Sequence, residues 1–171
     1  MKQGVDDMNS KINFDKGKAE IIIDNKRYIP VSFRSFYPAA HTVRNFDTHG
    51  FSLFSIFPSG IKCSLNEPYS QFGEVWIGEK EYCWENLKTQ IDMFIENAPN
   101  AKFSLMVHLD TRDWFLEQNK EGVDSFHYLI QTAGWHKWRE SAAQFMCDMV
   151  DYVESEYPNR LFSVFLFGSF F

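Results

Sequence analysis

The stretch LFSVFLFGSFF, residues 161–171, is a nearly continuous apolar run, and its character decides how the rest of the chain is interpreted. Apolar residues follow one another here without regular polar alternation, which is typical of a strand covered on both faces. A helix that spans a bilayer needs about 20 apolar residues, and serine and glycine interrupt this run well before that length. The sequence therefore predicts a buried strand over 161–167 and no membrane anchor.

An order of strand followed by helix precedes this strand and repeats along the chain. Apolar runs predict further strands, and apolar residues three and four positions apart predict the helices between them. Gly50, Pro99 and Pro158 stand where the predicted helices end. Strands of this kind that alternate with helices form parallel α/β sheets. The predicted strands are 31–36, 51–57, 102–110 and 161–167, and the predicted helices are 39–50, 84–99 and 135–158.

The first part of the chain is expected to differ from this α/β pattern. Residues 1–18 are predicted to be a polar lead, and residues 19–30 predict a short β-hairpin that turns at Asp24 and Asn25. At 171 residues, the chain suits one domain with a sizeable core and is too short for two ordinary ones. We therefore expect a single domain over residues 19–171.

The composition excludes several classes of partner. A net charge of −6 provides no basic surface for phosphates, so nucleic acid is not an expected partner. The N-terminal residues lack the apolar segment of a secretion signal, and three cysteines without metal-ligand spacing are typical of a reducing compartment. No glycine-rich turn follows the first predicted strand, which argues against a nucleotide site. We therefore expect a cytoplasmic protein without membrane contacts and without a cofactor.

Two long connections mark the expected functional side of the sheet. Helix-to-strand connections are short, whereas residues 58–83 and 111–134 form long strand-to-helix connections. Parallel α/β proteins bind ligands at the carboxyl ends of their strands, where such connections lie. These connections mix aromatic rings with carboxylates, which suits sugars because their C–H faces stack on rings while their hydroxyl groups hydrogen-bond. The candidate substrate-binding residues are Arg34, Glu67, Trp76, His108, Asp110 and Trp114.

Two of these candidates have alternative roles. Arg34 stands among apolar residues of the first predicted strand, so we expect it to be buried against either a ligand or a structural carboxylate. His108 and Asp110 point to the same face of their strand and form either a ligand-binding pair or part of a metal site. No third metal ligand follows at a convincing spacing, so no metal site is assigned. No catalytic residue is assigned either.

Three segments share their order and spacing with one enzyme family. They are IIIDNKRYIPVSFRSF (21–36), HTVRNFDTHGFSLFSIFPSG (41–60) and AKFSLMVHLDTRDWF (101–115). The first places a short hairpin before an arginine-bearing strand, and the third places a tryptophan after a strand. Together they resemble the front half of a glycoside hydrolase (β/α)8 barrel of the β-galactosidase type, close to family 42. The resemblance covers about residues 19–168.

The resemblance implies a fold and a sugar-binding residue. The implied fold is α/β, a partial TIM barrel of about four parallel βα units preceded by a short N-terminal β-hairpin, so residues 19–171 would form a single incomplete (β/α) barrel domain. Arg34 matches the sugar-binding arginine of the family's first strand. The acid/base carboxylate of the family follows strand four, where this chain reads GSFF (168–171), and the nucleophile follows strand seven.

We therefore expect a truncated glycoside hydrolase domain of the β-galactosidase type. On its own, this carbohydrate-related domain would be inactive because both catalytic carboxylates are missing. Its inner face and its fourth-strand edge would be open, so we also expect self-association through them. Two alternatives stay open. One is a non-catalytic half-barrel that dimerises and binds carbohydrate, and the other is a small metal-dependent α/β hydrolase with the metal at His108 and Asp110.

Overall fold

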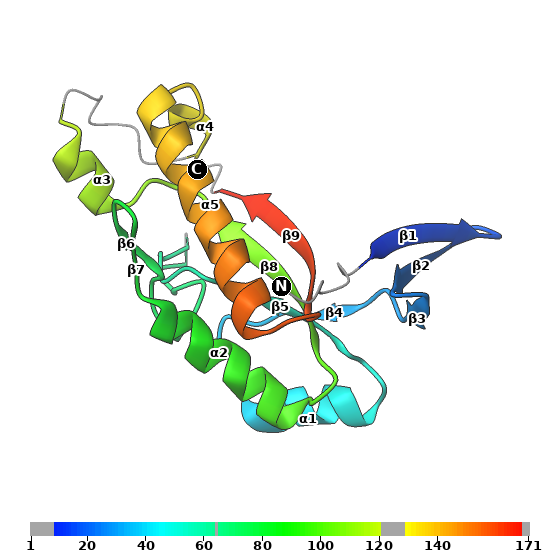
Figure 1. Ribbon diagram of the computed structural model, residues 1–171. Coiled ribbons are helices and arrows are strands. Elements are labelled where there is room, and N and C mark those ends of the chain that lie inside the picture. Colours follow the sequence, from blue (N-terminus) through cyan, green and yellow to red (C-terminus); the bar gives the residue numbers. More distant parts are fainter. Residues whose placement is uncertain (1–8, 64, 121–128, 169–171) are drawn as a thin grey trace, which may run out of the picture.

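The computed structural model describes residues 9–63, 65–120 and 129–168 and has a mixed α/β fold (Figure 1). Its main sheet consists of β4 (Ser32–Phe33), β5 (Leu53–Ile56), β8 (Lys102–His108) and β9 (Leu161–Phe167). The strands are adjacent in this order, and every neighbouring pair is parallel. The predicted parallel sheet is therefore confirmed, and β9 has the bounds that its apolar run predicts.

Three helices cover one face of the main sheet (Figure 1). They are α1 (Ala40–Thr48), α2 (Trp84–Asn97) and α5 (His136–Glu156), each close to its predicted range. Alternate residues of the strands point toward these helices and form a core in which rings and aliphatic chains are fully buried. This core includes Phe54, Ile56, Phe94, Phe103, Leu105, Val107 and Phe145.

The connection before α5 contains two further short helices, α3 (Asp113–Gln118) and α4 (Leu129–Thr132). The connection before α2 contains a small antiparallel ribbon of β6 (Trp76–Gly78) and β7 (Glu81–Tyr82). Both connections leave the carboxyl ends of their strands, as the sequence predicts. They therefore bring irregular backbone and polar side chains together at one edge of the main sheet.

The opposite face of the main sheet carries a row of serine hydroxyl groups. Ser55 and Ser104 are paired across β5 and β8, and Ser104 is paired with Ser163 on β9. The Oγ atoms of Ser32 and Ser55 are 3.0 Å apart, and Ser163 donates to Ser104 Oγ over 2.8 Å. Because the serines alternate with the helix-facing core residues, this row marks the face that α1, α2 and α5 do not cover.

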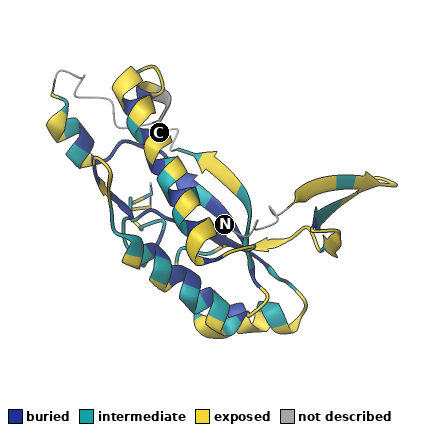
Figure 2. Ribbon diagram, viewed as in Figure 1, coloured by how far each residue is buried: buried dark blue, intermediate teal, exposed yellow. Residues whose placement is uncertain are grey.

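The strand β9 is one of the two edge strands of the main sheet, on the opposite side from β4. Val164, Phe165 and Leu166 are 42%, 56% and 48% exposed, so side chains on both faces of the strand reach the surface (Figure 2). Fully burying one such side chain contributes about 1.5–3 kcal/mol. The prediction that 161–167 forms a strand is thus confirmed, and within the described residues its side chains are less buried than its apolar run alone predicts.

A second, antiparallel sheet lies beside the amino-terminal ends of the main strands (Figure 1). It consists of β1 (Ser10–Asp15), β2 (Lys18–Ile23) and β3 (Lys26–Tyr28). The pair β2–β3 is the predicted hairpin, and its turn residues Asp24 and Asn25 have φ of 48° and 63°, as a tight hairpin turn requires. The strand β1 falls within residues 1–18, where the sequence predicts only a polar lead.

The first strand of the main sheet is shorter than predicted, and Arg34 is not buried. The predicted strand 31–36 is reduced to the edge strand β4, which ends before Arg34. The Arg34 side chain is exposed, with its Cζ 5.5 Å from the centre of the Phe57 ring. A guanidinium at a sheet edge reaches water and needs no buried anion. The expected burial of Arg34 is therefore wrong.

No helix within the described ranges combines the length and the apolarity that crossing a membrane requires.

Candidate functional site

A cavity of about 490 Å³ opens at the carboxyl ends of β5 and β8. One wall is formed by residues 60–62 and 74–77 of the connection after β5, and the other by residues 111–114 after β8. Both segments belong to the two long connections in which the sequence predicts a site. The cavity is therefore on the predicted functional side of the sheet.

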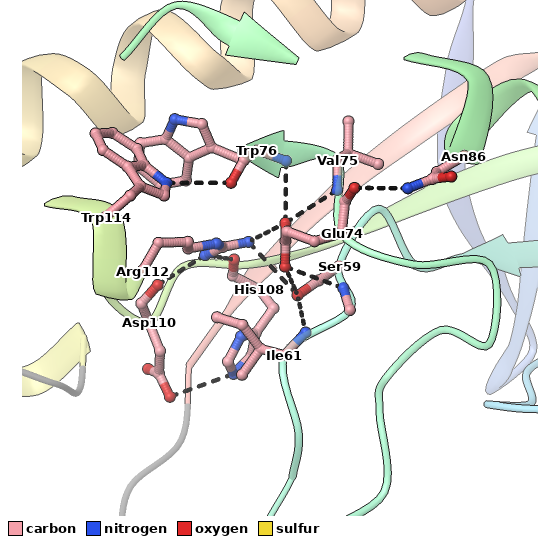
Figure 3. A network of polar contacts seen from close by, with 11 residues as sticks. Ser59, Ile61, Glu74, Val75, Trp76, Asn86, His108, Asp110, Arg112 and Trp114 are labelled. Atoms are coloured by element: carbon pink, nitrogen blue, oxygen red, sulfur yellow. Dashed lines mark hydrogen bonds and ion pairs between the residues drawn. The ribbon is translucent and has the colours of Figure 1, made fainter. Parts of the chain in front are cut away.

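Glu74 holds the first wall together through a network of donors (Figure 3). Its Oε2 accepts from the backbone N–H of Gly60 over 3.0 Å and from the Ser59 hydroxyl over 3.2 Å. Its Oε1 accepts from the backbone N–H groups of Val75 and Trp76 over 3.1 and 3.0 Å. These four donors already use most of the acceptor capacity of a carboxylate, so Glu74 fixes the backbone around it.

Gly60 allows the wall to close this tightly. A Cβ atom at this position would lie 2.5 Å from the backbone nitrogen of Glu74, which no ordinary packing tolerates. Glycine is therefore required here because two backbone segments approach each other.

Arg112 connects the Glu74 network to the end of β8. Its Nη2 lies 3.1 Å from Glu74 Oε1, and its Nη1 donates to the carbonyl oxygens of His108 and Asp110, both over 2.7 Å. The side chain is only 4% exposed, and its Cζ lies 4.9 Å from the centre of the Trp76 ring. A buried guanidinium of this kind fixes the geometry of both walls because its donors are rigidly arranged.

Three buried donors on residues that line the cavity lack a hydrogen-bond partner among the described residues. They are Nε of Arg112, Oγ1 of Thr111 and Nε1 of Trp76. An unpaired buried donor costs about 1–3 kcal/mol. Oxygen atoms of a ligand or of bound water in the cavity are the natural acceptors for such groups.

Trp114 supplies the aromatic surface of the cavity. It is half-buried, and its Nε1 donates to the Trp76 carbonyl oxygen over 3.2 Å (Figure 3). It also lines a second cavity of about 500 Å³ between α3 and α5. This anchored ring lines the cavity, and its role in binding stays a prediction.

Trp76 has a different position from the one that a sugar platform requires. It is 1% exposed, and its ring stacks on Phe145 with 4.9 Å between ring centres and 9° between planes. Trp76 therefore lines the cavity with one ring face covered by Phe145, and its binding role stays a prediction. Trp76 also supports the wall from behind and carries Arg112 over its ring.

His108 and Asp110 are close together, as predicted. His108 Nε2 lies 3.3 Å from Asp110 Oδ2, and the two residues are 0% and 5% exposed. The His108 ring packs against Tyr69 and Phe167, with ring centres 4.4 and 5.0 Å away. Arg112, which lines the cavity, donates to both backbone carbonyl oxygens of the pair.

Glu67 and Arg34 lie apart from the cavity wall. The Glu67 carboxylate is exposed and accepts a hydrogen bond from the Tyr37 hydroxyl, which raises the pKa of that phenol. The Arg34 guanidinium lies over the Phe57 ring. The structure thus brings Trp76, Trp114, His108 and Asp110 together around Arg112 and leaves Arg34 and Glu67 outside this group. Residues 169–171, where the family's acid/base carboxylate is expected, lie outside the described residues.

The residues that hold the site together are not in the predicted binding set. They are Glu74, Arg112, Ser59 and Gly60. Glu74 and Arg112 are 38 positions apart, so no motif spacing reveals their contact. The sequence signal that could have pointed to these two residues is a charged side chain beside apolar or aromatic residues, as in GEVW (73–76) and DTRDW (110–114).

The comparisons with known proteins identify no relative. No protein-family model matches the chain, and no curated protein or solved structure matches it. Among residues 9–63, 65–120 and 129–168, no group of three or more histidine, cysteine, aspartate or glutamate side chains is arranged to hold a metal ion.

Proposed function

We propose that this chain is a carbohydrate-binding part of a β/α barrel of the glycoside hydrolase type, with the sugar held in the cavity beside Trp114. The observation that carries the proposal is an anchored aromatic ring next to unpaired buried donors at the carboxyl ends of parallel strands. A sugar stacks its C–H face on a ring and offers hydroxyl oxygens to donors. The cavity volume lies within the usual range of about 300–1,000 Å³ for small-molecule sites.

The topology supports a partial TIM barrel over the other parallel folds. The four strands are adjacent in chain order, and the helices between them lie on one face. Doubly wound sheets reverse their strand order and place helices on both faces, whereas barrels keep the order and place all helices outside. The serine row then lies on the face that would point into a barrel.

In this proposal the chain binds carbohydrate but does not hydrolyse it. A retaining glycoside hydrolase needs two carboxyl groups about 5 Å apart, one as nucleophile and one as acid/base. Glu74 is occupied by backbone and guanidinium donors, and Asp110 is paired with buried His108. Neither carboxylate is placed for proton transfer, and Asp113, the remaining carboxylate of the described cavity lining, would need a second carboxylate to form a catalytic pair. The metal-dependent alternative has no supporting observation among the described residues.

Titration of tryptophan fluorescence with methyl β-galactoside tests the binding. We expect a saturable change, because the sugar stacks on Trp114, and an affinity about fivefold weaker or worse in Trp114→Ala. The matched control is Trp84→Ala, since Trp84 is also half-buried but stacks on Tyr152 away from the cavity. Equal loss in both variants, or no saturable change in the wild-type chain, would count against the cavity.

An assay with nitrophenyl glycosides tests the second part of the proposal. The purified chain is expected to release no nitrophenol above the rate of a heat-denatured sample. Robust turnover would show that a catalytic carboxylate pair is present and would sink the non-catalytic assignment.

We also propose that two copies of the chain associate through β9. Among the described residues no strand pairs with the outer edge of β9, where Val164, Phe165 and Leu166 are exposed, and no residue of 161–168 carries a charge. Antiparallel pairing of two such edges brings apolar side chains together and opposes no like charges.

Light scattering after size exclusion tests this association. Phe165→Lys is expected to raise the dimer dissociation constant about tenfold, because each interface would then oppose two cations. Leu65→Lys is the control, since Leu65 is 77% exposed outside the main sheet. A wild-type chain that is monomeric at all accessible concentrations would exclude the proposal.

A further inference from the structure

A separate cavity of about 360 Å³ lies at the amino-terminal ends of β8 and β9, next to β3. The two cavities lie at opposite ends of the strands, because the proposed carbohydrate site is at the carboxyl ends. Three chain segments line it: β3, the connection from α2 to β8, and the connection from α5 to β9. We propose that this cavity binds a small oxyanion, a phosphate or sulfate group, independently of the carbohydrate site.

The lining of this cavity is basic. Lys26, Lys102 and Arg160 each come from a different segment, and no carboxylate residue is among the described residues that line it. Burial lowers the pKa of Lys102, and the nearby Arg160 and Lys26 charges lower it further, while Asp24 opposes this change. Three cations gathered in one hollow of a chain with net charge −6 indicate a local function for them.

The negative ends of the neighbouring helix dipoles neutralise only part of this positive charge. The cavity lies just beyond the carboxyl ends of α2 and α5, and each helix end contributes about half a negative charge. Two helix ends therefore offset about one of the three cations. The Asp24 carboxylate accepts from the Asn9 backbone N–H over 2.9 Å and does not line the cavity. Even if Asp24 is counted in full, about one positive charge remains uncompensated.

The cations are also held in place by the backbone. Arg160 Nη1 donates to the carbonyl oxygens of Pro99 and Ala101 over 2.9 and 3.0 Å, which fixes the guanidinium at the cavity. Lys102 Nζ donates to the Asn159 carbonyl oxygen, and an ammonium has two further N–H donors. A fixed guanidinium beside an ammonium with remaining donors is a suitable receptor for a tetrahedral oxyanion.

Isothermal titration of the full chain with inorganic phosphate, at constant ionic strength in sodium chloride, tests the proposal. We expect saturable binding that sulfate reproduces and acetate does not, because acetate lacks the tetrahedral set of oxygens. Lys102→Met is expected to weaken phosphate binding about tenfold, since one charge-assisted contact is lost. Lys102→Arg is expected to retain most of it.

Lys11→Met is the matched control, because Lys11 is an exposed lysine of β1 outside the cavity. Far-UV circular dichroism of each variant confirms that it is folded. Absence of saturable phosphate binding to the wild-type chain would overturn the proposal, as would equal weakening in Lys11→Met and Lys102→Met. Glycerol 2-phosphate in parallel distinguishes the source of the group: tighter binding than inorganic phosphate assigns the cavity to a phosphate ester, and weaker binding assigns it to the free ion. Because the cavity is remote from Trp114, failure here leaves the carbohydrate proposal unchanged.

Discussion

Replacement of Arg112 by methionine is expected to lower the free energy of unfolding by about 3 kcal/mol. The change removes the ion pair to Glu74 and the donors to the carbonyl oxygens of His108 and Asp110. These acceptors then lie in a buried region without a donor, and leaving such groups unpaired is more costly than the net gain from the original bonds. Chemical denaturation followed by circular dichroism measures the difference.

Arg44→Met is the control for this prediction. Arg44 is exposed and donates to Asn97 Oδ1 over 2.8 Å. Its loss is expected to change the stability by less than about 0.5 kcal/mol. If Arg112→Met were equally harmless, Arg112 would not connect the two walls of the cavity as described.

Replacement of Trp76 by alanine is expected to cost about 3–5 kcal/mol. The indole is fully buried, stacks on Phe145 and lies in edge contact with Trp114, at 5.4 Å between ring centres. Its removal leaves a cavity behind the wall and takes away the surface under Arg112. The same denaturation experiment measures the loss.

The neighbouring Ile77 provides the comparison for Trp76. Ile77 belongs to the same strand but is 50% exposed, so Ile77→Ala is expected to cost about 1 kcal/mol or less. A Trp76→Ala variant as stable as Ile77→Ala would contradict the buried position of Trp76 and restore it as a surface residue.

The strands and helices of the main sheet could be predicted because each carries its own signal. The run LFSVFLF is continuous in apolarity and became β9 with the same bounds, and Gly50, with φ of 84°, follows α1 as a helix-ending glycine. The strand β1 was missed because its alternation, Ile12 and Phe14 between polar residues, is short. Both side chains are also mostly exposed, at 67% and 74%, so within the described residues β1 buries no apolar face that would account for these two apolar residues.

Only the location of the candidate site could be predicted from the sequence, and most of its residues could not. Loop lengths indicate the edge of the sheet, and Trp114 follows from its place after a strand. Burial decides the rest, and burial depends on contacts between segments that are distant in sequence. Trp76 is covered by Phe145 of α5, and Arg34 is exposed because its strand is a short edge. Glu74 and Arg112 meet across two connections, and no local pattern records that contact.

The indole N–H signals of the ¹⁵N-labelled chain test most directly the claim that the cavity beside Trp114 binds carbohydrate. During a titration with methyl β-galactoside, the account predicts a progressive shift of the Trp114 signal, assigned through Trp114→Phe. It predicts no shift for Trp84, which stacks on Tyr152 at 4.6 Å outside the cavity. Unchanged signals from all five tryptophans up to the solubility limit of the sugar, or equal shifts of Trp84 and Trp114, would contradict it.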